Sequence, residues 1–300
     1  MQTIILLGPT AVGKSKAAVE LALQINGEII SADSMQVYRG MDIGTAKPTK
    51  EEQKGIPHHL IDIRNPEESW TVSDFVEQSN HLTIQLSSKG KTPIIVGGTG
   101  LYLWTLINGY NFAGIKSDEA IRKRLEELPP STLYAQLSTV DPLSAQKIHP
   151  HNKKRVMRAL EVFELTGEPI SKQQEKLANG KQLTATIIGL TLPRNQLYEH
   201  IEQRIENMIK AGLIDEVKGL LDKGYSKGLT SMQALGYKEV VEFLEGRWDR
   251  EKLIYELKKR TRHFARRQMT WFRRFRNVQW IDATPENLNN LAKFARIEEW

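Results

Sequence analysis

The sequence contains no cysteine among its 300 residues. Disulfide bonds and cysteine-ligated zinc sites are therefore excluded, and the composition is typical of a protein from a reducing compartment. Long apolar runs are also missing, because the longest are strand-sized and fall well short of the ~20 residues that span a bilayer. No charged leader precedes the first apolar run, so we expect no signal peptide, no membrane contact and a cytoplasmic protein.

Acidic residues are in deficit: 36 Asp and Glu face 42 Lys and Arg, which leaves a formal net charge of +6. This balance favours a polyanionic partner, although net charge alone does not identify one. A hydrophobic content of 40% is ordinary for a globular protein, and the length fits about two domains. We expect a monomer with a substantial core.

Five short apolar runs, each bounded by turn or polar residues, predict buried parallel strands. They are residues 3–7, Glu28–Ser31, Pro93–Gly97, Thr186–Leu192 and Val278–Ile281. Helical patterns separate these runs. The sequence therefore predicts an α/β fold with a doubly wound parallel sheet.

No run between about Gly114 and Leu183 predicts a strand. This stretch instead contains helical patterns broken by proline and glycine, near Asp118–Leu128, Pro130–Ser138, Pro142–Ile148 and Lys153–Thr166. We therefore predict a helical insertion domain, residues 114–183, within a core domain formed by residues 1–113 and 184–300.

The first predicted strand leads directly into a complete G-x-x-x-x-G-K-[ST] motif. Its residues are Gly8, Pro9, Thr10, Ala11, Val12, Gly13, Lys14 and Ser15, and a helix-forming segment follows. Strand, glycine loop and helix in this order are the context of a P-loop. Backbone N–H groups would surround the phosphates, Lys14 would contact the terminal phosphates and the Ser15 hydroxyl could ligate Mg²⁺. We predict a site for a di- or triphosphate.

Two further loops follow predicted strands and should meet the same edge of the sheet. Asp33 comes after the second strand, where it could bind Mg²⁺, cap a helix or accept a proton. The third strand ends in Gly97-Gly98-Thr99, whereas many P-loop nucleotidases carry a metal-binding acid there. Its absence argues against ordinary ATP or GTP hydrolysis. The adjacent His58 and His59 would point in opposite directions, which favours hydrogen-bonding roles over a shared metal.

A basic helix is predicted over Arg250–Arg276, with an apolar stripe at Leu253, Leu257, Phe264, Trp271 and Phe275. Nine cations interleave with this stripe between residues 258 and 276. A solvated basic face is the plain alternative. Cations mixed with aromatic residues favour contact with a phosphate backbone.

Ten short strings occur in order along nearly the whole chain: Gly8–Ser15, Ser31–Ser34, Tyr38–Pro48, Pro57–Asp62, Gly97–Tyr102, His149–Pro150, Arg155, Arg158–Glu161, Gly236–Tyr237 and Arg266–Phe272. Taken together, these strings resemble the bacterial tRNA dimethylallyltransferase (tRNA isopentenyltransferase) family. The Asp-Ile-Gly-Thr-Ala-Lys-Pro string at Asp42–Pro48 is the most specific of them.

The resemblance implies transfer of a dimethylallyl group from its diphosphate to N6 of the adenosine 3′-adjacent to the anticodon. It implies that the P-loop and Arg204 bind the diphosphate with Mg²⁺ on Ser15, and that Asp33, Thr99 and Lys14 are catalytic. His200 stands where family members often have a second arginine. The residues implied to contact the tRNA anticodon stem-loop are Asp33, Ser34, Met35, Gln36, Thr99, Arg122, Arg155, Arg158, Gln233, Gly236, Tyr237, Lys238, Arg262, Arg266 and Arg267.

Two other functions compete with this interpretation. A P-loop kinase of a nucleoside or small metabolite would use ATP, but it has no need of the basic C-terminal region. A non-catalytic RNA-binding module would have no need of an intact P-loop beside Asp33.

Overall fold

The computed structural model describes residues 2–109, 118–177 and 182–295. Contacts divide the chain into one unit formed by Met1–Trp104 and Thr184–Trp300, and a second unit, Thr105–Leu183. The expected domain boundary between residues 113 and 114 lies outside the described residues.

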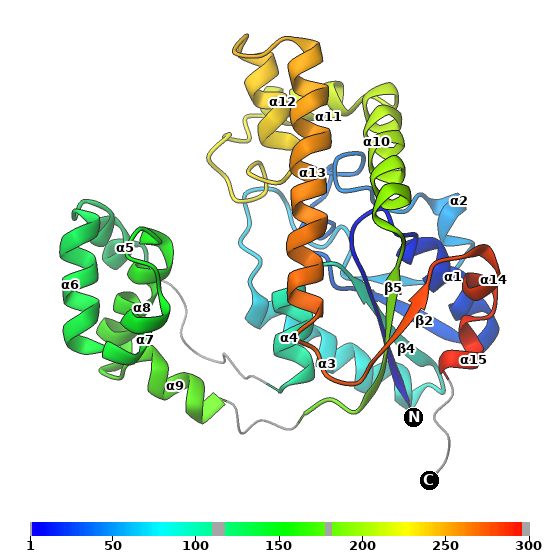
Figure 1. Ribbon diagram of the computed structural model, residues 1–300, viewed down its shortest axis with the longest axis horizontal. Helices are drawn as coiled ribbons and strands as arrows, with labels where there is room; N and C mark the ends of the chain where they lie inside the picture. The colour runs from blue at the N-terminus through cyan, green and yellow to red at the C-terminus, as the bar shows by residue number, and fades with distance from the viewer. Residues whose placement is uncertain (1, 110–117, 178–181, 296–300) are drawn as a thin grey trace. The chain divides into compact units, whose positions relative to one another are not determined.

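A six-stranded parallel sheet forms the centre of the first unit, in the order β3-β2-β4-β1-β5-β6 (Figure 1). Its strands are β1 (Thr3–Leu7), β2 (Gly27–Ser31), β3 (His58–His59), β4 (Thr92–Gly97), β5 (Ala185–Thr191) and β6 (Val278–Asp282). The predicted α/β class is confirmed, and the five predicted strands agree with the observed ones to within a residue at each end. The prediction that all five are buried is wrong for β6, where only Ile281 is buried, because this strand lies at the edge of the sheet. The edge strand β3 was not predicted, because two histidines form no apolar run.

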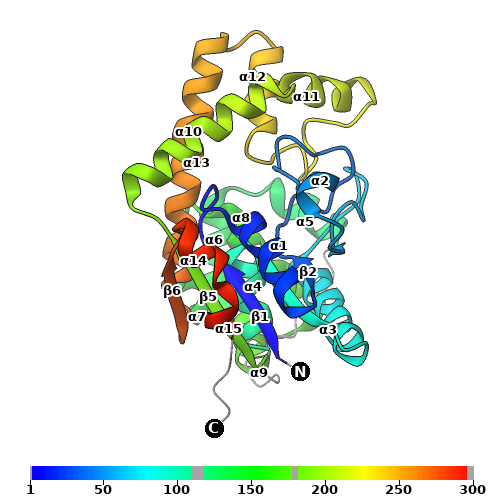
Figure 2. The ribbon, with the colours of Figure 1, turned by 90° about the vertical axis from the view of Figure 1, so that its right-hand side faces the viewer.

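Helices cover both faces of the sheet. Alternate strand residues, including Ile4, Leu6 and Ile94, share a core with α1 (Lys14–Ile25). The short helices α14 (Pro285–Asn289) and α15 (Leu291–Ala295) pack beside α1 (Figure 2). The capped helix α3 (Val72–Ser88) connects β3 to β4 in the reverse direction along the sheet, so right-handed crossovers place it on the opposite face.

Four helices form a layer beyond the carboxyl edge of the sheet. They are α10 (Arg194–Lys210), α11 (Leu213–Asp222), α12 (Tyr237–Leu244) and α13 (Arg250–Phe272), and α13 packs on both α10 and α12. Figure 1 shows α13 running from α12 at one end to α4 (Gly100–Ile107) at the other. A side chain at Gly100 would lie 2.6 Å from Trp271 Cβ, so these two helices meet closely. A single turn, α2 (Lys50–Gln53), follows the Asp42–Pro48 string.

The predicted helix over Arg250–Arg276 exists but ends at Phe272, and the predicted apolar stripe is partly wrong. The buried face consists of Leu253, Leu257, Thr261, Ala265, Gln268 and Phe272. Phe264 and Trp271 are only half-buried. The predicted stripe lies along one edge of the buried face. The rest of that face includes Thr261, Ala265 and Gln268, which are small or hydrogen-bonding residues.

The second unit is helical and has its own core. Its helices are α5 (Glu119–Glu126), α6 (Pro130–Val140), α7 (Pro142–Lys147), α8 (Lys153–Thr166) and α9 (Ile170–Leu177). Side chains of Asp118, Asp141 and Asn152 cap three of them. Leu125, Leu133 and other apolar residues of α5, α6 and α8 pack together. Four of these helices were predicted, whereas α9 was not.

Within the described ranges, no helix is both long and apolar enough to cross a membrane.

Candidate active site

Three loops leave the sheet side by side where the adjacent strands β2, β4 and β1 end. The parallel register pairs Leu7 with Gly97 and Ser31 with Val96, which aligns the ends of the three strands. The loops are the P-loop, the turn at Asp33 and the Gly98-Thr99 segment. Open α/β sheets bind ligands at this edge.

The P-loop leads into a helix whose first turn lacks a side-chain cap. Gly13 is the N-cap of α1 with φ of 96°, and no acidic residue occupies the first turn. Gly8 has φ of 153°, and a Cβ there would lie 2.7 Å from the Leu190 carbonyl oxygen. The free N–H groups and the positive end of the helix dipole are therefore left for an anion.

Lys14 and Arg204 bring two cations to this loop. Lys14 Nζ donates a hydrogen bond to the Pro9 carbonyl oxygen at 2.8 Å. Burial and the charge of Arg204 lower the pKa of Lys14 to about 7, against an opposing effect of Asp33. Burial also lowers the pKa of Arg204, although a guanidinium remains charged. A diphosphate between them would offset their mutual repulsion and raise the pKa of Lys14.

Asp33 uses one carboxylate oxygen to close a turn. Its Oδ1 accepts hydrogen bonds from the N–H groups of Met35 at 2.8 Å and Gln36 at 3.3 Å. Its Oδ2 has no hydrogen-bond partner among the described residues. The helix-capping interpretation is wrong, because a turn and no helix follows Asp33. The turn uses Oδ1, so the proton-accepting interpretation involves the other oxygen atom and remains compatible with the geometry.

Thr99 lies beside this turn. Its Oγ1 accepts a hydrogen bond from the N–H of Ser34 at 3.1 Å, and its own N–H donates to the Ala32 carbonyl oxygen at 3.3 Å. These bonds tie the end of β4 to the end of β2 and place the Thr99 hydroxyl next to the Asp33 turn.

The glycines that end β4 have no room for an acidic side chain. A Cβ at Gly97 would lie 2.2 Å from the Ala32 carbonyl oxygen, and one at Gly98 would lie 2.3 Å from Gln268 Nε2. Gln268 of α13 donates to the Gly98 carbonyl oxygen at 2.9 Å and accepts from the Thr10 N–H at 2.8 Å. This side chain therefore joins the P-loop to the Gly98-Thr99 segment.

A cavity of about 360 Å³, here called the reaction cavity, opens between these loops and α10–α13. The predicted site residues that line it are Thr10, Lys14, Ser15, Asp33, Ser34, Met35, Gln36, Thr99, Arg204, Gln233, Gly236, Lys238 and Arg267. Ile205, Met208, Leu213, Leu257 and Phe264 add an apolar wall. Residues far apart in the sequence thus converge on one space that has a phosphate-binding end and an apolar side.

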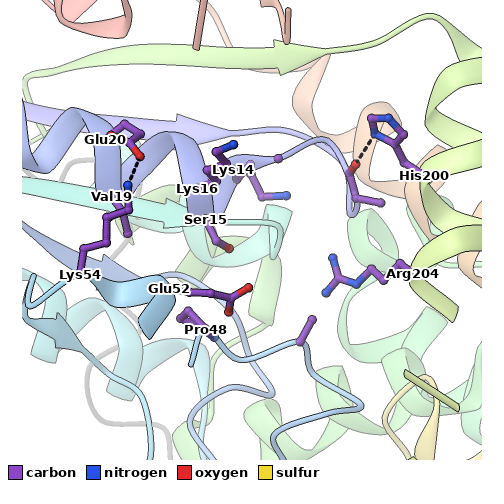
Figure 3. A pocket seen from close by; sticks show the side chains of 13 residues that line it. Lys14, Ser15, Lys16, Val19, Glu20, Pro48, Glu52, Lys54, His200 and Arg204 are labelled. Carbon is purple, nitrogen blue, oxygen red and sulfur yellow. Dashed lines mark hydrogen bonds and ion pairs between the residues drawn. The ribbon is translucent and has the colours of Figure 1, made fainter. Parts of the chain in front are cut away.

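A second cavity, of about 560 Å³, shares Lys14, Ser15, Ala46, Pro48 and Arg204 with the first (Figure 3). Arg204 points into it from α10, opposite the P-loop residues. His200 also reaches it and contacts the Ala11 carbonyl oxygen through Nδ1 at 3.3 Å. The histidine that replaces the usual arginine therefore lies against the backbone of the P-loop.

Residues Ser231–Lys238 form one side of the reaction cavity but do not all face it. Ser231 Oγ donates to the Pro66 carbonyl oxygen at 2.6 Å, and buried Glu239 accepts from the Gly236 N–H at 2.8 Å. The Tyr237 side chain is fully buried, and its hydroxyl donates to Glu216 at 2.6 Å. A tRNA contact through this side chain is therefore not available, and Tyr237 supports the segment from within.

The cations of α13 divide into two groups. Arg262 pairs with Glu202 of α10 at 2.7 Å, and Lys258 pairs with Glu206 at 2.8 Å. Lys259 and Arg260 pair with Glu256 in the same way. By contrast, Arg266, Arg267, Arg273, Arg274 and Arg276 are exposed and have no ion-pair partner in the described part of the chain. Between residues 258 and 276, the cations without an ion-pair partner among the described residues therefore lie in the last turns of α13 and just beyond it.

In the second unit, the arginines expected to contact tRNA also differ from one another. Arg122 and Arg158 pair with Glu161, which is fully buried, at 3.0 Å and 2.7 Å. These bonds lower the pKa of Glu161 against the opposing effect of its burial. Arg155 is exposed at the start of α8. Two of the three arginines thus help to hold the unit together as well as presenting charge at its surface.

The residues around Ser15 fit Mg²⁺ that binds together with a diphosphate. Mg²⁺ favours substrate phosphates, water and one or two protein oxygens over a complete protein cage. Ser15 is exposed in both cavities, and the Asp33 carboxylate lines the first. Over the described ranges, no cluster of three or more His, Cys, Asp or Glu side chains could hold a metal.

Two polar residues that shape the site, Gln268 and Glu216, were not among the predicted site residues. Gln268 lies inside the Arg266–Phe272 string, so the resemblance offered a signal for it. Glu216 carries no local signal, because an acid in the first turn of a helix is common on electrostatic grounds.

Known proteins support these observations. Residues 36–275 match the model of a family described as IPP transferase. The chain is 48% identical over 295 residues to a tRNA dimethylallyltransferase of Carboxydothermus hydrogenoformans, which covers 97% of this chain and 94% of the relative. The corresponding protein of Anoxybacillus flavithermus is 45% identical, with coverage of 96% and 92%.

Two solved structures are also similar. A tRNA isopentenylpyrophosphate transferase from Bacillus halodurans has 44% identity and a TM-score of 0.72, covering 98% of this chain and 96% of that one. A eukaryotic dimethylallyltransferase described as acting on tRNA has 29% identity and a TM-score of 0.85, covering 97% of this chain and 77% of that one. Family match, identity and coverage agree, and the chain belongs to the IPP transferase family.

Proposed function

We propose that this protein transfers the dimethylallyl group of dimethylallyl diphosphate to N6 of the adenosine 3′-adjacent to the anticodon of tRNA, releasing pyrophosphate. The observation that carries the proposal is the reaction cavity. It combines a P-loop, an available carboxylate oxygen on Asp33, an apolar wall and the cation Arg267, which has no ion-pair partner within the described ranges. Membership of a family whose relatives are named tRNA dimethylallyltransferase supports the substrate pair.

The reaction is a displacement at an allylic carbon. The bond between N6 and C1 of the dimethylallyl group forms as the bond between C1 and the diphosphate oxygen breaks. Adenine N6 is a weak nucleophile, because its lone pair is delocalised into the ring. Asp33 Oδ2 accepts the N6 proton as the new bond forms, a role suited to a positioned carboxylate. The target base must leave its stack to reach this oxygen.

The leaving group gathers negative charge at the other end of the cavity. Lys14, Arg204 and the N–H groups of the P-loop stabilise that charge. Thr99, held against Ser34, supplies a hydroxyl between the two reacting ends. Mg²⁺ held by Ser15 would add a further positive charge on the diphosphate. The apolar wall around Phe264 suits the hydrocarbon chain and limits attack by water.

The tRNA is proposed to contact the rim of the reaction cavity, the arginines in the last turns of α13 and the arginines of the second unit. Ser34, Met35, Gln36, Gln233, Gly236 and Lys238 surround the entering base. Arg266 and Arg267 are proposed to contact phosphates of the anticodon stem-loop, and Arg122, Arg155 and Arg158 of the second unit are proposed to contact the stem-loop as well. We further propose that the enzyme acts as a monomer in the cytoplasm, where its tRNA substrate is found.

The main alternative is a P-loop kinase of a small metabolite. Ala32 and Gln268 fill the space beside Gly97 and Gly98, so no acidic side chain can follow β4 to bind the metal of an ATP-dependent kinase. This argues against the kinase. A direct test incubates the protein with unmodified tRNA and either dimethylallyl diphosphate or ATP, followed by nucleoside mass analysis. We expect N6-dimethylallyladenosine with the first donor only. A tRNA with guanosine at the target position should stay unmodified, and a phosphorylated product would support the kinase.

A further inference from the structure

The Asp42–Pro48 string is the most specific motif of the sequence, yet the reaction outlined above gives it no task. In the structure it forms part of the cavity wall. Gly44, Thr45, Ala46 and Pro48 all line the reaction cavity. The question is what holds this irregular segment in place, since it lies outside the sheet and its helices.

One carboxylate holds the start of the string. Glu216 of α11 accepts hydrogen bonds from three consecutive backbone N–H groups, those of Asp42 at 2.9 Å, Ile43 at 2.7 Å and Gly44 at 3.0 Å. Successive N–H groups that converge in this way form an anion-binding nest. Here the anion is a side chain of the protein itself, so the nest serves as an anchor.

Tyr237 adds a fourth donor to the same carboxylate. Its hydroxyl donates to Glu216 Oε1 at 2.6 Å. Burial and the neighbouring carboxylate raise the pKa of Tyr237, so the phenol stays protonated and continues to donate. A Cβ at Gly44 would lie 2.4 Å from the Tyr237 ring, which explains the glycine. Glu216 therefore joins two cavity walls, the Asp42–Pro48 string and the start of α12.

A second charged anchor holds the end of the string. The Lys47 ammonium donates to the Tyr38 carbonyl oxygen at 2.8 Å and pairs with Asp42 and Asp62. Its side chain is only 5% exposed. The string is thus fixed by the Glu216 carboxylate at its start and by the Lys47 ammonium near its end, with Thr45 and Ala46 between them.

The fixed segment in turn orients Gln36. Gln36 Nε2 donates to the carbonyl oxygens of Thr45 and Ala46, at 3.3 Å each, and its Oε1 accepts from Ser31 Oγ at 3.0 Å. Gln36 lines the reaction cavity, and its N–H binds Asp33 Oδ1. A continuous set of hydrogen bonds therefore runs from Glu216 through the string to the residues beside the available oxygen of Asp33.

We propose that Glu216 is a positioning residue for the acceptor nucleotide. It holds the Asp42–Pro48 string so that Gln36 and the Asp33 turn present a fixed surface to the entering adenosine. The proposal rests on the proposed function. The P-loop is held separately, by Gln268 and the end of β4. Ala46 and Pro48 of the string also line the cavity beside the P-loop, but Glu216 binds the other end of the string, at Asp42–Gly44. Glu216 should therefore affect the acceptor side far more than donor binding.

The central test is Glu216→Gln, which keeps the shape of the side chain but replaces one acceptor oxygen with an NH₂ group. That group must face N–H donors of the nest or the Tyr237 hydroxyl. We expect kcat/KM for tRNA to fall about 10- to 100-fold, the range for a displacement of order 1 Å at a reacting pair. The dissociation constant for dimethylallyl diphosphate should stay within about twofold of wild type.

The matched control is Asp215→Asn, which removes the same charge from the same first turn of α11. Asp215 is exposed and no hydrogen bond joins it to the string in the described part of the chain. This variant should keep wild-type kinetics. If Glu216→Gln folds poorly, Tyr237→Phe removes one hydroxyl only and should lower kcat/KM for tRNA in the same direction by a smaller factor.

Gln36→Ala tests the route of the effect. It should reproduce the loss for tRNA, and it should add little in the Glu216→Gln background because both changes break one set of contacts. Wild-type tRNA kinetics for Glu216→Gln would overturn the proposal. An equal loss of donor affinity, or fully multiplicative effects with Gln36→Ala, would also overturn it. A wild-type protein that forms no prenylated nucleoside would instead overturn the proposed function.

Discussion

Arg266 and Arg267 should account for much of the salt dependence of tRNA binding, whereas Arg262 should contribute little. All three lie within two turns of α13 and belong to the same run of cations. Arg262 is already matched by Glu202 at 2.7 Å, while Arg266 and Arg267 are exposed and have no ion-pair partner among the described residues. Counterion release depends on cations that are free to neutralise phosphates.

The size of the effect follows from the number of contacts. Each phosphate contact on a single strand contributes about 0.7 to the slope of log K against log salt concentration. The double variant Arg266→Gln, Arg267→Gln should therefore reduce the slope by about 1.4. Over a fourfold rise in salt, this corresponds to about sevenfold less loss of affinity than wild type shows.

The assay is binding of an anticodon stem-loop RNA across a salt series, with Arg262→Gln as the matched control. The control should keep the wild-type slope, and loss of its partly exposed ion pair should change the melting temperature little. Donor binding should change little in all variants, because Arg262 and Arg266 do not line the reaction cavity and Arg267 lines it without belonging to the P-loop. An unchanged slope in the double variant, or equal flattening by Arg262→Gln, would refute this assignment.

Four further predictions concern the donor, the chemistry and the stability of the fold. Asp33→Ala should lower single-turnover prenyl transfer by about 10²- to 10⁴-fold while calorimetry shows donor affinity nearly unchanged; full activity would make Asp33 a turn cap only. The pKa of Lys14 is about 7, so this side chain loses its positive charge as pH rises above 7. Donor affinity should fall over the same range, and Lys14→Met should remove that dependence. A pH profile shared by both proteins would contradict this. The same shift predicts that the free energy of unfolding rises between pH 7 and 10.5, because unfolded Lys14 rebinds a proton. His200→Arg places a second arginine one turn from Arg204 on α10 and should tighten donor binding several-fold by adding positive charge. Unaltered affinity in calorimetry would contradict a role for position 200 in binding the diphosphate.

Apolar strands and the P-loop could be predicted because their signals are local. Each predicted strand contains two to four consecutive large apolar residues. The glycines of the P-loop are required by its own backbone conformation. The resemblance to a known family then indicated which side chains would meet. The structure brings Lys14, Asp33, Thr99 and Arg204 to one cavity, as that resemblance implied.

Elements that depend on distant partners could not be predicted in this way. β3 is two residues long and exists because Ile29 and Ile30 pair with it at the sheet edge. The buried face of α13 includes Thr261 and Gln268, and no hydrophobic periodicity marks a glutamine as buried. Gln268 is buried because it hydrogen-bonds to Thr10 of the P-loop and to Gly98 after β4, which lie 258 and 170 positions away in the sequence.

Asp215 and Glu216 show why the same limit applies to function. They are adjacent acids in the first turn of α11, and every local rule assigns both to a favourable interaction with the helix dipole. A rotation of about 100° around the helix axis separates them. One faces solvent, whereas the other receives three N–H groups from a segment more than 170 positions away. Because composition, charge and helix position are matched, any kinetic difference between Asp215→Asn and Glu216→Gln must arise from these tertiary contacts.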